Sequence, residues 1–123
     1  MGHDKAPATP AVRALRQAGV AFTEHPYRYV ERGGTSAFAT EAGVDEHAVV
    51  KTLIMEDEAK RPVVVLMHGD REVSTKELAR ILAVKTVRPC APETAERHSG
   101  YLVGGTSPFS LRKPMPVYVE ASV

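Results

Sequence analysis

The residue that most clearly invites chemistry is Lys51, a cation between AVV and TLIM in a run that otherwise reads as an interior strand. Burying a lysine is expensive unless a partner compensates the charge. Two interpretations stay open. Either the strand lies at an edge and the lysine reaches solvent, or the ammonium points into a pocket, where it can bind a phosphate, a ribose hydroxyl or a developing oxyanion.

A second segment, YLVGGTSP, places two glycines between an apolar triplet and a polar turn. Gly104 and Gly105 let the backbone approach a ligand closely and expose its N–H groups. Thr106 and Ser107 follow, and Pro108 stiffens the exit from the turn. A tight turn between strands explains the same residues.

The third segment is HPYRY at 25–29, where a proline-restricted backbone presents Tyr27 and Tyr29. An aromatic ring with a hydroxyl can stack on a terminal adenine or bind a ribose. Core packing or a surface position is the competing interpretation.

The common catalytic motifs HExxH, CxxC and GxSxG do not occur. The five histidines are scattered without metal-ligand spacing, so we expect surface or capping roles for them and neither a metal site nor a cofactor. Cys90 is the single cysteine, which excludes an intrachain disulfide, and we assign it a packing role.

Composition predicts one globular domain in a chain of 123 residues, 43% apolar and 25% charged. A net charge of +1 is not that of a protein that coats nucleic acid. Four basic residues near the helix at 75–83 could form a modest basic face, and a solvated helix surface is the competing interpretation. They are Lys76, Arg80, Lys85 and Arg88. No run resembles a membrane span or a secretory signal, so a cytoplasmic location is expected.

These residues need elements to position them. We expect a loose arm over 1–8 and a single domain over 9–123. The first predicted helix runs from Pro10 to before Gly19 with Thr9 as its cap, and the second is capped by Thr35 or Ser36 and runs through Ala42. Ser74 caps a third, in which Leu78, Ile81 and Leu82 are expected to be buried. The fourth runs from Pro92 to His98.

The strand predictions begin with Val20–Tyr29, which runs into an irregular segment at Pro26. A hairpin joins 49–55 to 63–67, and short strands follow at 86–89 and 117–120. Asp45 opens a short turn. The fold class is therefore α/β (α+β), with a mixed, partly closed β-sheet flanked by short helices.

Taken in order, these segments resemble the YbaK and prolyl-tRNA-synthetase-associated editing family. The resemblance runs from about Thr9 to Ala121, and it rests on TPAVRALRQAGV, FTEHPY, VVKTLIM, ELARILAVKTV and SGYLVGGTSPF. It implies an editing-domain fold and the cleavage of mischarged tRNA, typically a proline tRNA that carries cysteine or alanine.

The resemblance also implies roles for individual residues. The family's central lysine corresponds to Lys51, its GxxxP loop to Gly104–Pro108, and the tyrosine of its HxY segment to Tyr27. Thr52 follows the lysine as in relatives and would help line the pocket. Substrate binding would therefore involve Tyr27, Thr52, Gly104, Gly105, Thr106, Ser107 and Pro108, with Lys51 as the catalytic residue.

The form GYLVGGxSP is closer to the cysteine-clearing branch, which implies a Cys-tRNA(Pro) deacylase of hydrolase or lyase type. In that branch the substrate's thiol attacks its own ester carbonyl, and no protein nucleophile is needed. Lys51 and the loop amides around Gly104 and Gly105 would orient the substrate and stabilise charge. The alternative substrate is Ala-tRNA(Pro) or another small amino acid.

The sequence departs from the family pattern at its C-terminus. Relatives continue beyond the strand that matches PVYVEA into a Gly-rich segment and an acidic residue, whereas this sequence ends at Val123. The resemblance thus leaves room for a shortened, non-catalytic binding module or for a homodimer whose second subunit supplies the missing wall. The partners expected are the tRNA acceptor end and prolyl-tRNA synthetase, with no membrane.

Overall fold

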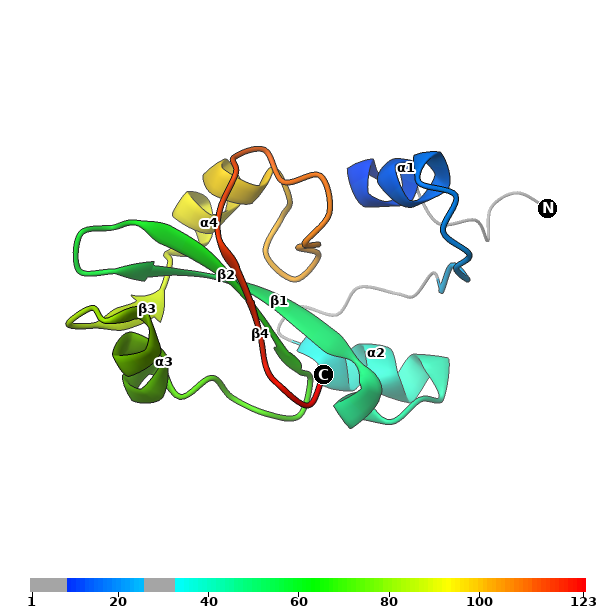
Figure 1. Ribbon diagram of the computed structural model, residues 1–123. Coiled ribbons are helices and arrows are strands. Elements are labelled where there is room, and N and C mark those ends of the chain that lie inside the picture. The colour runs from blue at the N-terminus through cyan, green and yellow to red at the C-terminus, as the bar shows by residue number, and fades with distance from the viewer. Residues whose placement is uncertain (1–8, 26–32) are drawn as a thin grey trace.

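The computed structural model describes residues 9–25 and 33–123, which form an open mixed sheet with short helices on both faces (Figure 1). The strand order is β3-β1-β2-β4. The strands are β1 (Val50–Asp57), β2 (Pro62–His68), β3 (Val87–Pro89) and β4 (Val117–Val119). β1 pairs antiparallel with β2 and β3, and β4 pairs parallel with β2. The mixed α/β fold is confirmed.

The hairpin of β1 and β2 forms because both strands are rich in β-branched and large apolar residues and a polar turn joins them. Asp57 organises that turn, since its carboxylate accepts hydrogen bonds from the amides of Ala59 (2.9 Å) and Arg61 (3.0 Å). Lys60 adopts a left-handed conformation, with φ of 62°. The predicted hairpin is confirmed, and β1 extends two residues further than predicted.

Alternation along the hairpin produces a core on each face of the sheet. Met55 and Val65 pack with Leu78 of α3 (Thr75–Leu82) on one face. On the other face, Ile54 and Val64 pack with Ala95 of α4 (Pro92–Ser99). The centre of the hairpin is therefore packed on both faces.

The helix boundaries follow local capping signals. The Thr9 hydroxyl accepts a hydrogen bond from the Val12 amide (3.2 Å) and starts α1 (Pro10–Gln17). Ser74 does the same for α3 through the Glu77 amide (3.2 Å). Asp45 caps a short 3₁₀ helix, η2 (Glu46–Ala48), and Gly100 ends α4. These predictions are confirmed, as are the positions of β3 and β4.

Three local predictions are wrong. Residues 20–25 form no strand, and the rest of that predicted strand lies outside the described residues. Neither Thr35 nor Ser36 caps α2 (Gly34–Ala42), which begins earlier, after Gly33. Ile81 is 60% exposed, because the side of α3 that carries Leu78 and Ala79 is the one that meets the sheet.

No helix in the described ranges has the length and apolar content needed to cross a bilayer. β4 forms one edge of the sheet, and all three of its residues are exposed. The predicted homodimer stays a prediction, as does the predicted division of the chain into residues 1–8 and 9–123.

Candidate active site

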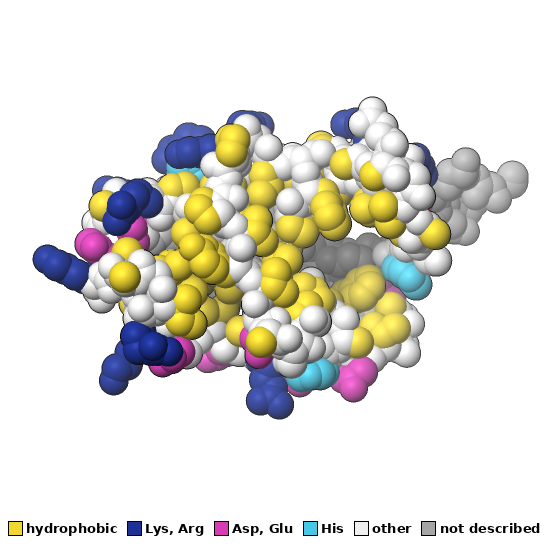
Figure 2. Space-filling model, in the orientation of Figure 1, with side chains coloured by type: hydrophobic (Ala, Val, Ile, Leu, Met, Phe, Trp, Pro, Cys, Tyr) yellow, Lys and Arg dark blue, Asp and Glu magenta, His cyan; other side chains and the backbone are white. Residues whose placement is uncertain are grey.

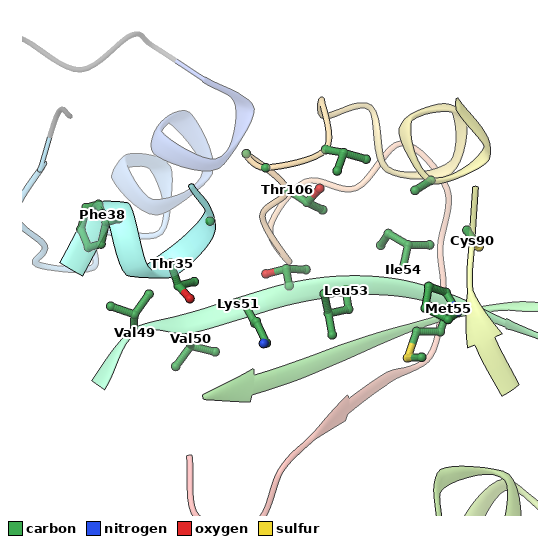
Figure 3. A pocket seen from close by; sticks show the side chains of 17 residues that line it. Thr35, Phe38, Val49, Val50, Lys51, Leu53, Ile54, Met55, Cys90 and Thr106 are labelled. Atoms are coloured by element: carbon green, nitrogen blue, oxygen red, sulfur yellow. The ribbon is translucent and has the colours of Figure 1, made fainter. Parts of the chain in front are cut away.

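A hollow of about 700 Å³ lies beside the first half of β1 (Figure 3). Three other segments complete its wall. These are the start of α2 with Gly34, Thr35 and Phe38, the junction of β3 and α4 with Pro89, Cys90 and Ala95, and the loop Val103–Thr106. The hollow thus gathers residues from four separate segments of the chain, and we call it the pocket.

The pocket forms where β1 loses its strand neighbour. β3 pairs only with Met55, Glu56 and Asp57, so the described residues provide the first half of β1 with a strand partner on the β2 side alone. The Ile54 carbonyl accepts from the Cys90 amide at 3.1 Å on the β3 side. In a strand, the backbone polar groups of every second residue point to the same edge. Val50 and Thr52, which lie four and two positions before Ile54, therefore direct their backbone polar groups toward the open edge.

Lys51 lines the pocket from β1 and is half-buried. Its Nζ donates a hydrogen bond to the Gly69 carbonyl (3.3 Å). In Figure 3 the Lys51 side chain extends to the same side of β1 as Leu53, whereas Ile54 and Thr106 lie on the other side. Lys51 and the glycine loop therefore both line the pocket, but the ammonium extends to the side of β1 away from Thr106.

Gly69 is the junction that holds this end of the pocket together. Its carbonyl oxygen is 3.0 Å from the Thr35 hydroxyl, which also lies 2.8 Å from a carboxylate oxygen of Glu46. A methyl group at Gly69 would lie 2.8 Å from the Glu46 carbonyl oxygen and from the Thr35 hydroxyl oxygen. Only glycine fits there without movement of the surroundings.

Two histidines pack beside this junction. The rings of His47 and His68 stack with centroids 3.8 Å apart. Buried His68 lies 2.7 Å from the His47 carbonyl through Nδ1 and 2.8 Å from the Ser122 hydroxyl through Nε2. A hydrogen bond from His47 lowers the pKa of Asp70. The expected surface or capping role is therefore wrong for His68, which joins β2 to the C-terminal segment.

The glycine loop has its own internal bonds. Gly104 has φ of 95°, a conformation that favours glycine. The Gly105 amide donates to the Leu102 carbonyl (2.9 Å) and the Val103 amide to a Glu96 carboxylate oxygen (3.1 Å). Within the described part of the chain, the amides of Gly104 and Thr106 have no such partner. In the glycine loop, these two pocket-lining amides are free to meet a ligand.

The structure brings five of the predicted site residues around the pocket: Lys51, Thr52, Gly104, Gly105 and Thr106. Ser107 and Pro108 do not line it, and the Ser107 hydroxyl accepts a hydrogen bond from the Phe109 amide (3.1 Å) within the loop. Tyr27 lies outside the described residues. The roles of these residues stay predictions.

Sequence reasoning missed Thr35, Phe38 and Gly69. The sequence predicts a helix cap at Thr35, yet the Thr35 hydroxyl contacts Gly69, which is 34 positions away in sequence. Phe38 lies on the short helix that borders the pocket. No spacing rule links these positions, because their proximity depends on how α2 packs against the end of the hairpin.

The pocket contains few groups able to act as acid, base or nucleophile. Among its described lining residues, Lys51 and Cys90 are the titratable ones. Burial raises the pKa of the Cys90 thiol to about 11, and the neighbouring Glu56 carboxylate acts in the same direction. The thiol is therefore protonated at neutral pH and is a poor nucleophile. No group of three His, Cys, Asp or Glu residues in the described ranges could hold a metal ion.

Comparison with known proteins decides the family, since residues 32–123 match the aminoacyl-tRNA editing domain. The chain belongs to this family. The editing domain is 29% identical over 112 residues to EbsC of Enterococcus faecalis, a candidate Cys-tRNA(Pro)/Cys-tRNA(Cys) deacylase. The aligned residues cover 90% of this chain and 68% of EbsC. It is also 33% identical over 81 residues to the proline–tRNA ligase of Desulfovibrio desulfuricans, which covers 66% of this chain and 14% of the ligase.

Solved structures share the fold of the editing domain. The hypothetical protein APE2540 superposes with a TM-score of 0.76 at 23% identity, over 91% of this chain and 73% of that one. A candidate trans-editing enzyme for prolyl-tRNA synthetase has a TM-score of 0.76 at 20% identity, over 94% of this chain and 74% of its own. The predicted family resemblance is confirmed.

Proposed function

We propose that this editing domain hydrolyses or otherwise cleaves mischarged Cys-tRNA(Pro), with the aminoacylated 3′ end in the pocket. The observation that carries the proposal is the composition of the pocket. It combines the half-buried Lys51 with two unpaired loop amides, and its described lining residues include no general base or reactive nucleophile. Such a site orients a substrate and stabilises negative charge.

A substrate that carries its own nucleophile suits this site. The cysteine thiol of the aminoacyl group attacks the ester carbonyl, forming a sulfur–carbon bond. The bond from that carbon to the ribose oxygen then breaks, and the thiol proton ends on the ribose oxygen. The products are a cyclic thioester and free tRNA. The amides of Gly104 and Thr106 would stabilise the negative charge that develops on the ester oxygen. Lys51 would join them once its side chain leaves the Gly69 carbonyl on the other side of β1.

Lys51 must change its partner to take part. Its ammonium donates to the Gly69 carbonyl at 3.3 Å, and no carboxylate of the described residues pairs with it. The cation is therefore not neutralised, and its flexible stem allows a ligand oxygen to replace the carbonyl. Thr52, whose backbone faces the open edge, would contact the substrate directly.

The test is deacylation of Cys-tRNA(Pro) by the wild type and by Lys51→Ala. Deacylation should fall on this substitution while thermal stability stays close to wild type. Methylating the substrate's sulfur should also abolish cleavage, because the nucleophile is blocked. Equal rates with free and methylated sulfur would instead favour water as the nucleophile.

Ala-tRNA(Pro) is the comparison substrate. Cysteine differs from alanine by one thiol group, which provides only about 1–3 kcal/mol of discrimination in an apolar site, so both substrates must be measured. Faster cleavage of Ala-tRNA(Pro) would assign the domain to alanine clearance. Binding of either tRNA without cleavage would assign a binding module.

The partner that we propose is prolyl-tRNA synthetase, in the cytoplasm where tRNA is charged. The support is the match to proline–tRNA ligases, in which the corresponding segment makes up 14% of the chain. A domain that acts separately would need the synthetase nearby to intercept its mischarged product. Pull-down of the synthetase in the presence of tRNA(Pro) tests this association.

A further inference from the structure

A second hollow, of about 620 Å³, lies at the junction of β1, β3 and α4. Four of its wall residues carry basic side chains: Lys60, Arg88, Arg97 and His98. We call it the basic hollow. Figure 2 shows Lys and Arg side chains over α4 and over the turn of the hairpin, at the end of the molecule opposite α1 and α2. The overall charge of +1 therefore conceals a local excess of positive charge.

Only part of this charge is neutralised within the protein. Arg88 lies 3.6 Å from the buried carboxylate of Glu56, whose Oε2 has no hydrogen-bond partner among the described residues. Lys60 and Arg97 have no ion-pair partner in the described ranges. Two exposed cations thus remain on the rim of a concave surface, which is the arrangement that attracts an anion.

The pKa of His98 reflects the positive charge around the basic hollow. Burial lowers the pKa of His98, and the nearby charges of Lys113 and Arg97 lower it further. Lys113 adjoins His98, since its amide donates to the His98 carbonyl (3.1 Å). The start of α4 adds to this field, because the methyl side chain of Ala91 at the N-cap cannot accept hydrogen bonds from the first-turn amides. Glu93 in that turn offsets the effect in part.

The basic hollow adjoins the pocket. Pro89 and Cys90 line both, so a ligand that fills the two must pass over these residues. A nucleic acid with one end in the pocket would carry its first phosphates onto the basic hollow. We propose that the basic hollow binds phosphate groups of the tRNA acceptor arm whose aminoacylated end occupies the pocket, an inference that rests on the proposed function.

The rival surface is the basic face of α3, which packs on the opposite face of the sheet from α4. There Arg80 is already paired with Glu77 within the helix. No pocket residue comes from α3, whereas α4 contributes Ala95 to the pocket wall. Geometry therefore favours the α4 side.

The experiment measures binding of an uncharged acceptor-arm RNA duplex with a single-stranded 3′ end, by fluorescence anisotropy at several salt concentrations. The double variant Lys60→Ala/Arg97→Ala should bind at least about tenfold more weakly, and its salt slope should fall by about 0.9 for each lost contact. The matched control is Lys76→Ala/Arg80→Ala on α3, which removes the same charge and should bind like the wild type.

The pKa of His98 is a second measurement, and it should not change if Lys60 and Arg97 only stabilise the fold. RNA binding should raise the His98 pKa, followed by NMR, because a phosphate offsets the charges of Arg97 and Lys113. The double variant should lose this response. If inorganic phosphate causes the same rise while RNA causes none, the basic hollow is a small-anion site and the proposal is overturned.

Other outcomes separate this proposal from the proposed function. Unchanged RNA affinity and salt slope in the double variant overturn the basic hollow, even if deacylation is normal. Equal losses in the α3 control overturn it as well. RNA binding that depends on Lys60 and Arg97 in a protein without deacylase activity supports the basic hollow and removes the proposed function.

Discussion

The two halves of β1 differ although they belong to one continuous strand. Residues 54–57 are buried, and Met55 and Glu56 have strand partners on both sides. Residues 50–53 are exposed or half-buried and, among the described residues, have a strand only on the β2 side. The closed half anchors both cores of the sheet. The open half offers backbone and side-chain polar groups to a hollow, so a rigid strand carries a site without a flexible loop beneath it.

Substitution within β1 would sharpen this contrast most strongly. Met55→Ala in the closed half should destabilise the fold by about 2–5 kcal/mol, because a side chain that is 1% exposed leaves a cavity. Val50→Ala in the open half, where the side chain is 43% exposed, should cost less than about 0.5 kcal/mol. Urea unfolding measures both. Similar losses would mean that the two halves are packed alike.

The second prediction concerns activity rather than stability. Lys51→Ala should lower kcat/KM for Cys-tRNA(Pro) by about 10²-fold or more, as expected for the loss of one charge-stabilising donor. Lys76→Ala, which removes a lysine from α3 outside the pocket, serves as the control and should retain most activity. A Lys51→Ala enzyme with wild-type kcat/KM would leave the open half without a catalytic role.

The third prediction compares two glycines that border the pocket region. Gly69→Ala should destabilise the protein by about 1–3 kcal/mol, because its methyl group would meet backbone and side-chain atoms at 2.8–2.9 Å. Gly105→Ala meets only the Leu102 carbonyl, at 3.7 Å, and should be nearly neutral. Thermal unfolding of both variants checks the difference. Equal stabilities would show that the Gly69 junction can relax.

The smallest expected effect is the pH dependence that Cys90 confers. Its thiol pKa is raised to about 11 in the folded protein, so the unfolded chain ionises first as pH rises. The free energy of unfolding should be unaffected below about pH 8.5 and should fall by about 1 kcal/mol near about pH 9.5. Comparing urea unfolding of Cys90→Ala isolates this contribution, since the variant should lose that part of the decline.

Local signals predicted much of the fold. The caps at Thr9, Ser74 and Asp45 act between neighbours in sequence, and each forms as expected. The hairpin follows from apolar composition and a polar turn. Predictions failed where burial depends on distant elements, as for Ile81 on α3 and for the absent strand at 20–25.

The site was predicted in part for the same reason. Lys51 stood out because a cation in an apolar run is unusual, and the paired glycines because of their conformational freedom. The sequence could not show that the Gly105 amide is bonded within its own turn. Nor could it reveal Thr35 or the contact between Lys51 and Gly69, which require the chain to fold back on itself.

The sequence by itself determined the hairpin, most helix ends and the family, because these depend on residue type and on short spacings. Tertiary structure alone decided that β3 stops beside Met55, that the open edge of β1 becomes a pocket, and that Lys60 and Arg97 meet at one hollow. The physical reason is that a strand edge or a charged concavity is a property of neighbours in space, which no local pattern encodes.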